Sequence, residues 1–129
     1  MKQVYFYWDA LDRLFDIHRY EYHTGLGWVN TVEDVFTYDH DSRMTGLTHY
    51  LRNNTANRPI YSWTYDQASR PTEFTSSYDG TADYTYDDTS QLTVADYDYQ
   101  TDEAYSYDSN GNRTNTGYTT GDGNRLTCD

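Results

Sequence analysis

Residues 61–72 read Tyr-Ser-Trp-Thr-Tyr-Asp-Gln-Ala-Ser-Arg-Pro-Thr, and this stretch decides the fold. Up to Tyr65, aromatic residues alternate with hydroxyl residues, a period of two that is typical of a β-strand with one packed and one polar face. Asp66 then opens a turn, because its carboxylate can accept hydrogen bonds from backbone N–H groups a few residues on. A return strand starts around Arg70. The stretch therefore predicts a β-hairpin with a loop of about four residues.

The same pattern recurs along the chain. Tyr38, Tyr86 and Tyr107 each start another copy, Trp8 starts an earlier copy with tryptophan in place of tyrosine, and residues 123–127 form the second half of a last copy. Successive starts are 30, 27, 21 and 21 residues apart. Such a repeat indicates an array of one small unit, and arrays build surfaces and scaffolds more often than a single catalytic pocket.

The repeats predict one domain over residues 1–129, an array of about six antiparallel β-hairpins whose first and last units are degenerate. We expect an all-β fold of about twelve strands that forms one continuous coiled strip of sheet, with no substantial helix. The turns are expected near residues 9–13, 39–43, 66–70, 87–91 and 108–113.

The pattern Tyr-Asp-x-x-small-Arg-Leu-Thr resembles the YD repeat of the RHS family over nearly all of the chain. That family includes bacterial polymorphic toxins, shell subunits of insecticidal toxin complexes, wall-associated proteins and teneurins. The glycine that the family usually has at the fifth position is replaced by Asp12, Ser42, Ser69 and Ser90, and is kept only at Gly111. Serine and aspartate also favour turns, so we expect the turn to be retained.

The resemblance implies a non-catalytic structural repeat protein. It is expected to be a segment of an extracellular or cell-surface RHS-type protein of bacterial origin, or a subunit of a self-assembling filament. Two alternatives stay open, a carbohydrate-binding surface module and a fragment of a toxin-encapsulating shell. The self-cleaving core of such shells has a proline-rich signature, whereas this chain has only Pro59 and Pro71, so the resemblance concerns the repeat region alone.

Five of the eight arginines lie at or beside one position of the motif. A guanidinium there can stack on tyrosine rings and bind the motif aspartate in a bidentate manner. The set could be a catalytic triad or a structural clamp made once in each hairpin. We favour the clamp, because a catalytic set has no reason to recur every 21 residues. The predicted structural motif residues are Trp8, Asp9, Arg13, Tyr38, Asp39, Arg43, Tyr65, Asp66, Arg70, Tyr86, Asp87, Tyr107, Asp108 and Arg113.

Composition alone would suggest disorder, since Leu, Ile, Val and Phe make up only 18 of 129 residues and the net charge is −12. Sixteen tyrosines and three tryptophans supply the missing apolar area. Lys2 is the only lysine, and this acidic balance argues against nucleic acids and anionic membranes as partners. No apolar run approaches the ~20 residues of a membrane helix, and no secretory signal is visible.

No cofactor or metal is expected. Residues 108–112 match a calcium loop only weakly, because the glycine and the final carboxylate are misplaced. Cys128 is the only cysteine, and we interpret it as a bystander. Asn53 lies in an N-glycosylation sequon within a polar loop. The histidines match no zinc spacing and are interpreted as surface side chains; they are His18, His23, His40 and His49.

The segment Val4-Tyr5-Phe6-Tyr7-Trp8 is apolar throughout. An end strand with this composition exposes aromatic surface and unpaired backbone groups. We therefore expect it to be an assembly edge, paired with another copy of the chain or with further RHS repeats. Glycans are the other partners that the exposed aromatic residues suggest.

Overall fold

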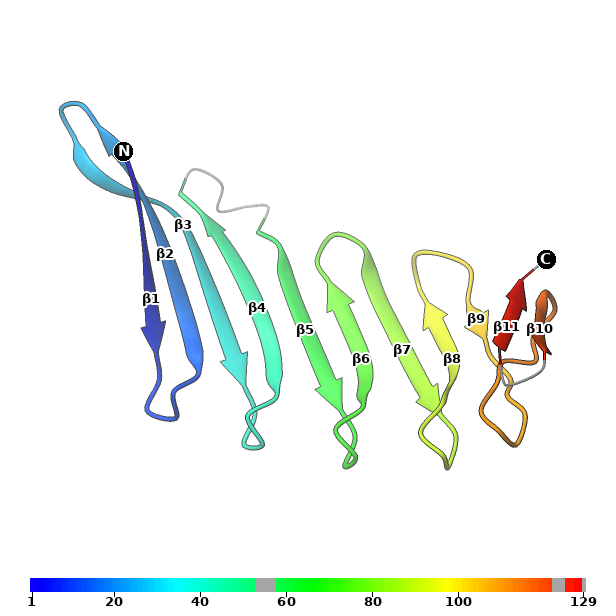
Figure 1. The fold of residues 1–129 in the computed structure, drawn as a ribbon. Coiled ribbons are helices and arrows are strands. Elements are labelled where there is room, and N and C mark those ends of the chain that lie inside the picture. The colour runs from blue at the N-terminus through cyan, green and yellow to red at the C-terminus, as the bar shows by residue number, and fades with distance from the viewer. Residues whose placement is uncertain (53–57, 122–124, 129) are drawn as a thin grey trace. The chain divides into compact units, whose positions relative to one another are not determined.

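The computed structural model describes residues 1–52, 58–121 and 125–128, and it confirms the all-β prediction (Figure 1). Nine antiparallel strands form one open sheet in the order of the sequence. Their bounds are β1 Lys2–Trp8, β2 Leu14–His23, β3 Gly27–Tyr38, β4 Met44–Leu51, β5 Ile60–Tyr65, β6 Pro71–Ser76, β7 Gly80–Tyr86, β8 Leu92–Tyr97 and β9 Glu103–Ala104. A separate pair consists of β10 Tyr118–Gly121 and β11 Arg125–Cys128. Within the described ranges there is no helix that could cross a membrane.

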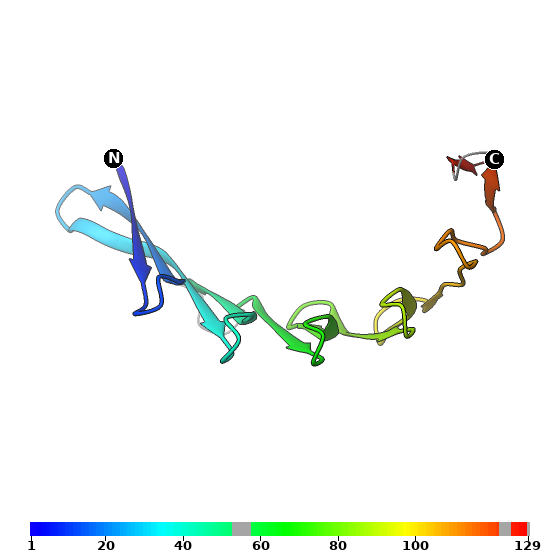
Figure 2. The same cartoon turned by 60° about the horizontal axis from the view of Figure 1, so that its bottom comes forward.

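The chain divides into two compact units, Met1–Thr81 and Ala82–Asp129. In the first unit, each strand from β1 to β5 is antiparallel to the strand that follows it. The motif turns after β1, β3 and β5 therefore lie along the same margin of this unit, as both views show (Figures 1 and 2). The connections at the opposite margin contain no motif.

Each motif turn is closed by two backbone hydrogen bonds. In the second copy, the Asp39 N–H donates to the Arg43 carbonyl at 3.0 Å, and the Ser42 N–H donates to the Asp39 carbonyl at 3.2 Å. Ser42 has φ 63°, a left-handed conformation that glycine adopts most easily. The fifth-position residues all share it, with φ 58° at Asp12, 63° at Ser69, 68° at Ser90 and 82° at Gly111. The predicted turn positions are confirmed.

The sheet has little fully buried interior. Among the residues whose burial is described, the buried apolar side chains are Ile17, Ala82 and Ala95. Aromatic rings provide the remaining packing on the faces of the sheet: the Trp63 and Phe74 centroids lie 5.4 Å apart, and Tyr61 stacks on Phe74 at 6.1 Å. A chain poor in aliphatic residues thus gains apolar contact from rings that keep one side in solvent.

The hairpin around residue 107 is less regular than predicted. Tyr107 and Arg113 form an isolated bridge, and β9 before them contains two residues. The return segment continues into Asn115 and Gly117, which are residue types depleted in strands. The described residues therefore hold fewer strands than the twelve expected. The predicted glycosylation site, Asn53, lies outside the described residues.

Candidate functional site

The motif aspartate organises its own turn. Asp39 Oδ1 accepts the backbone N–H groups of Asp41 and Arg43, both at 2.9 Å. Its Oδ2 accepts Arg43 Nε at 2.6 Å. The same three contacts recur at Asp9 and at Asp66, with distances from 2.6 to 3.0 Å. The carboxylate therefore serves the backbone with one oxygen and the arginine four residues later with the other.

These contacts favour the ionised carboxylates. At Asp66, the backbone hydrogen bond from Arg70 is the largest cause that lowers the pKa, and the Arg70 side chain lowers it further. The pKa of Asp9 is lowered in the same way, first by the backbone N–H of Arg13 and then by its side chain. A group held in its anionic form by its own turn is a poor general base.

The arginine also reaches the next hairpin. Arg13 Cζ lies 4.8 Å from the centroid of the Tyr38 ring, and its Nη1 donates to the Asp39 carbonyl at 3.2 Å. In return, the Tyr38 hydroxyl donates to the Leu14 carbonyl at 2.7 Å. We call this set the clamp: a motif aspartate, the arginine four residues later, and the motif tyrosine of the following hairpin. The clamp adds side-chain contacts between successive hairpins to the backbone pairing of β2 with β3.

A second clamp repeats the first. Arg43 Cζ lies 4.9 Å from the Tyr65 centroid, and Arg43 Nη1 donates to the Asp66 carbonyl at 2.8 Å. The Tyr65 hydroxyl donates to the Met44 carbonyl at 2.7 Å. Stacking on tyrosine and pairing with aspartate, both predicted for these arginines, are present in the first unit.

The prediction that the motif arginine binds both oxygens of the motif aspartate is wrong. Both Arg13 nitrogens that approach Asp9, Nε and Nη2, lie 2.7 Å from the same oxygen, Oδ2. The other oxygen is already occupied by the backbone N–H groups of Leu11 and Arg13. Because Oδ1 accepts the backbone hydrogen bonds of the turn, only Oδ2 is left to accept hydrogen bonds from the guanidinium.

The motif copies of the second unit lack this arginine. Gln91 is the residue four positions after Asp87, and its backbone N–H donates to Asp87 Oδ1 at 2.8 Å. Tyr86, at the end of β7, precedes this turn. The turn keeps its form with glutamine in place of arginine.

Arg113 lies beside the motif position, one residue after the position that Arg13 and Arg43 occupy. Asn112, four residues after Asp108, donates its side-chain amide to Asp108 Oδ2 at 2.9 Å. Arg113 is one residue further on and pairs with Tyr107 across the hairpin. Its Cζ lies 4.2 Å from the Tyr105 centroid and 5.5 Å from that of Tyr118. Tyr107 keeps the motif contact, since its hydroxyl donates to the Leu92 carbonyl at 2.8 Å.

The predicted assembly edge is the outer strand of the sheet, β1, whose one partner strand within the described residues is β2. Its large side chains are exposed, with Phe6 57% and Trp8 59% accessible; the others are Val4, Tyr5 and Tyr7. Trp8 occupies the position that Tyr38 and Tyr65 hold in the later copies. No arginine of the described chain stacks on Trp8, so this first ring of the motif series is uncovered.

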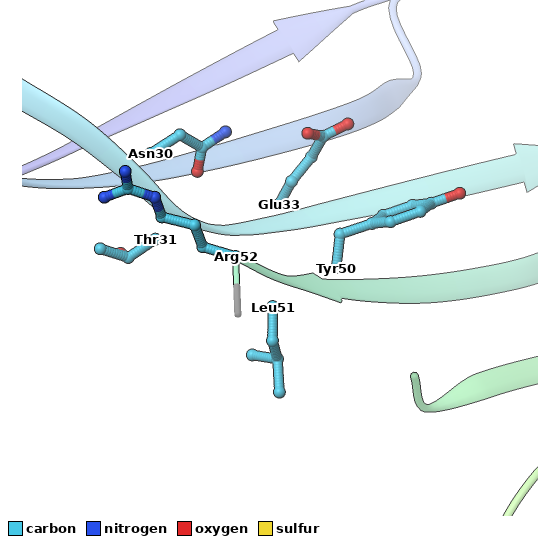
Figure 3. Close-up of a pocket in the computed structure, with 6 residues that line it drawn as sticks. All are labelled: Asn30, Thr31, Glu33, Tyr50, Leu51 and Arg52. Atoms are coloured by element: carbon cyan, nitrogen blue, oxygen red, sulfur yellow. The ribbon is translucent and has the colours of Figure 1, made fainter. Parts of the chain in front are cut away.

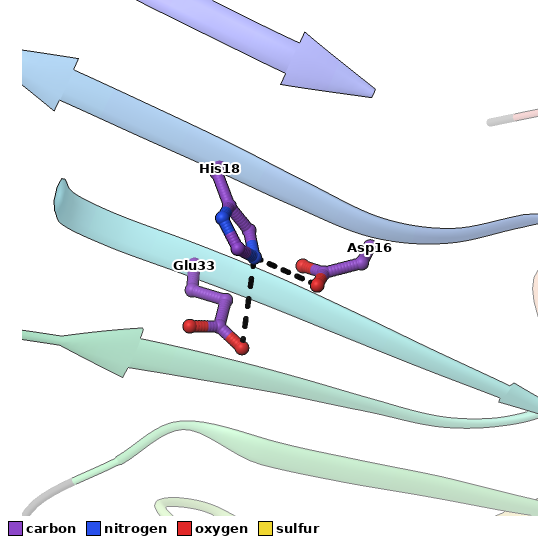
Figure 4. Close-up of side chains that lie close together, drawn as sticks. All are labelled: Asp16, His18 and Glu33. Atoms are coloured by element: carbon purple, nitrogen blue, oxygen red, sulfur yellow. Dashed lines mark hydrogen bonds and ion pairs between the residues drawn. The ribbon is translucent and has the colours of Figure 1, made fainter. Parts of the chain in front are cut away.

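A cluster that sequence reasoning missed lies on β2 and β3 (Figure 4). His18 Nε2 is 2.7 Å from Asp16 Oδ2 and 3.9 Å from Glu33 Oε1. One ligand atom from each of the three residues lies within 4.8 Å of the others. Asp16 and His18 are two residues apart on β2 and so share a face, but Glu33 is distant in the sequence.

Glu33 also borders a hollow of about 220 Å³ beside the end of β4 (Figure 3). Asn30, Tyr50 and Arg52 are among the residues that line it. Asn30 Oδ1 is buried and makes no hydrogen bond within the described residues. One face of the Tyr50 ring is covered by Arg58, whose Cζ lies 4.8 Å from the centroid. The hollow offers polar groups beside one aromatic ring.

No protein-family model matches this sequence, and no curated protein matches it.

Proposed function

We propose that this chain is a non-catalytic structural repeat protein that associates through β1 with a second copy of itself or with further repeats of the same kind. The observation that carries the proposal is the uncovered Trp8 ring, 59% exposed. In the next two copies, Tyr38 and Tyr65 are each covered by the arginine of the preceding hairpin. A hairpin added at β1 would supply that arginine. Such a protein fits an RHS-type cell-surface segment or a filament subunit.

The backbone of β1 supports the same proposal. As the outer strand, it has one edge without a partner strand in the described chain, and edge strands of this kind pair with other chains unless they are blocked. Lys2 is the one lysine available for blocking. Covering about 400 Å² of apolar surface contributes roughly 10 kcal/mol before the cost of association.

The chemistry of the motif supports a non-catalytic role. Asp9, Asp39 and Asp66 each spend one oxygen on backbone N–H groups and the other on an arginine. The arrangement recurs from hairpin to hairpin. Recurrence of this kind is typical of a structural device in repeat proteins.

Sedimentation velocity over a concentration series tests the proposal. We expect the wild-type chain to sediment above its 15.2 kDa monomer mass with rising concentration. The double variant Val4→Lys/Phe6→Lys should remain monomeric, because charges on an edge strand oppose pairing. Leu26→Lys, the same kind of change at an exposed position in the β2–β3 turn, should behave as wild type. A wild-type chain that stays monomeric at every concentration would refute the proposal.

Carbohydrate binding is a second candidate, favoured by the hollow beside Tyr50. The unpartnered Asn30 Oδ1 and the Glu33 carboxylate could accept hydrogen bonds from sugar hydroxyls. Calorimetric titration with a panel of neutral oligosaccharides tests it. Binding that is lost in Tyr50→Ala but kept in Tyr22→Ala, an exposed tyrosine outside the hollow, would support this function. Absence of binding across the panel would reject it.

A further inference from the structure

We propose that Asp16, His18 and Glu33 form a binding site for a divalent first-row transition metal ion of the Zn²⁺ type. The three side chains belong to β2 and β3, and all are partly buried. A mixed set of one imidazole and two carboxylates suits zinc and its neighbours in the series. The three ligands belong neither to the clamp nor to β1, and the inference does not depend on the proposed assembly.

The strand geometry places the ligands together. Asp16 and His18 are two residues apart on β2, so their side chains share a face. Glu33 lies directly opposite His18 on β3. Figure 4 shows the three side chains converging from these two strands.

A β-bulge decides which residue of β3 faces His18. Tyr20 pairs with Asn30, but Arg19 pairs with Val32, so Thr31 is an extra residue in β3. Continuous pairing would have set Val32 opposite His18. The Thr31 hydroxyl donates to the Arg19 carbonyl at 3.0 Å and stabilises the bulge. Bulges often re-aim a side chain beside a functional site, and this one brings a carboxylate into the cluster.

Two carboxylates and one imidazole meet in this cluster. Within the described residues, neither Asp16 nor Glu33 pairs with an arginine or lysine, and His18 is their shared partner. By contrast, buried Asp34 on the same strand pair binds both Arg19 and His49. Two carboxylates converging without a strong cation favour a bound metal ion.

Asp16 contributes a second observation. Its side chain is 15% exposed. Its Oδ1 atom is buried and makes no hydrogen bond within the described part of the chain. A buried carboxylate oxygen without a partner is costly, and a bound ion or water is the usual explanation. A metal ion bound by both carboxylate oxygens of Asp16 would give Oδ1 that partner.

The His18 ring is held so that Nε2 faces the two carboxylates. Its Nδ1 lies 3.2 Å from the Tyr20 hydroxyl, and the Tyr7 ring lies 4.9 Å away between centroids. The phenol oxygen of Tyr20 can accept the Nδ1–H of His18. Fixing the far nitrogen in this way leaves Nε2 free for a metal.

The distances require only small side-chain movements. Ligand atoms bound tetrahedrally at about 2.1 Å from zinc lie about 3.4 Å from one another. His18 Nε2 is 2.7 Å from Asp16 Oδ2 and 3.9 Å from Glu33 Oε1, so one separation must widen and the other must narrow. Three protein ligands leave one position for water. The imidazole ligand disfavours Ca²⁺ and Mg²⁺, which prefer oxygen.

Calorimetric titration of the metal-free full chain with ZnCl₂ tests the site. We expect one site per chain that His18→Ala and Glu33→Gln each weaken at least tenfold. His23→Ala is the matched control, because His23 also lies near a carboxylate, Glu21 Oε2 at 3.9 Å, but both side chains are exposed. It should bind zinc as wild type does. MgCl₂ and CaCl₂ at the same concentrations should give no comparable binding.

Nitrogen-15 spectra of the histidine rings provide a second readout. Zinc should shift the Nε2 resonance of His18 while Nδ1 keeps its proton, and the other histidines should change little. If His18→Ala does not fold, Glu33→Gln decides, since Glu33 is the more exposed ligand. Absence of zinc binding to wild type would overturn the proposal. Binding by Glu33→Gln and His18→Ala as tight as that of wild type would overturn it too.

Discussion

Successive hairpins are joined differently in the two compact units. In Met1–Thr81, Arg13 and Arg43 each cover the motif tyrosine of the next hairpin. In Ala82–Asp129, the equivalent positions hold Gln91 and Asn112. The turns are nevertheless the same in both units, because the aspartate still accepts two backbone N–H groups in each copy. The comparison shows that the turn and the link between hairpins are separable devices.

The pairing of strands within a hairpin is also common to both units. Thr64 and Thr72 face one another across the first-unit hairpin at 2.9 Å between hydroxyl oxygens. Thr85 and Thr93 do so at 3.2 Å in the second unit. Cross-strand threonine pairs stabilise sheets in either setting. The arginine is therefore the element of the motif whose loss distinguishes the second unit.

The largest effect is expected when a clamp arginine of the first unit is replaced by glutamine, the residue at an equivalent position of the second unit. Arg43→Gln removes the stack on Tyr65 and the hydrogen bond to the Asp66 carbonyl, and should lower the free energy of unfolding by about 1–2 kcal/mol. Chemical denaturation followed by tryptophan fluorescence measures it, since all three tryptophans lie before residue 82. Arg52→Gln, outside the motif, is the control. Equal stability of the two variants would contradict the role of the clamp.

The reciprocal change should strengthen the second unit. The Gln91 side chain lies against the turn that contains Gly111, where an added Cβ would be 2.9 Å from its amide nitrogen. Gln91→Arg could therefore reach the Tyr107 ring and raise the local free energy of opening by about 0.5–1 kcal/mol. Amide hydrogen exchange of Val94 and Ala95 measures this, and unchanged protection would mean that arginine alone does not make the link.

Asp96 in the second unit should respond to acid in the opposite sense to the motif aspartates. Folding lowers the pKa of Asp9 and of Asp66. Their ionised carboxylates therefore stabilise the fold at pH values above their unfolded-state pKa, near 4, and this stabilisation is lost as the pH falls further. The neighbouring Asp102 carboxylate raises the pKa of Asp96, so repulsion there disappears as the pH falls. Asp96→Asn should thus stabilise the second unit at pH 7 but not at pH 4. Thermal melts of the Val94 and Ala95 amide signals measure this, and an equal gain at both pH values would contradict it.

A smaller effect is expected at the fifth position of the turn. Asp12 has φ 58°, and its side chain makes no hydrogen bond or ion pair with the described residues. Asp12→Gly should stabilise the first unit by about 0.5 kcal/mol, since relief of the left-handed conformation exceeds the added chain entropy. Urea denaturation measures it. Ala10→Gly, in the same turn, is the control and should not stabilise.

The fold could be predicted from the sequence because its signals are local. Alternation before Tyr65 and the turn-forming Asp66 lie within a few residues of each other, and the sheet follows from repeating them. The sequence predicted that Arg43 would stack on a tyrosine, but not that the tyrosine would be Tyr65. Which tyrosine it meets depends on how neighbouring hairpins pack. Arg113 lies one residue beyond the motif position, and its contact with Tyr105 could not be read from that position.

The Asp16, His18 and Glu33 cluster could not be found from spacing. The extra residue Thr31 shifts the pairing of β2 with β3, and this shift brings Glu33 opposite His18. A bulge has no clear signature in a single sequence, whereas zinc motifs are recognised by short, fixed intervals. Only the register reveals the cluster.

A double-mutant cycle on Arg43 and Tyr65 tests the clamp most directly. The variants Arg43→Gln and Tyr65→Leu, and their combination, should show a coupling free energy of about 0.5–1 kcal/mol, because each change removes the same stacked contact. A control cycle that pairs Arg43→Gln with Tyr50→Leu should show none, since Tyr50 stacks with Arg58. If the Arg43 and Tyr65 changes are instead additive, the motif does not join one hairpin to the next.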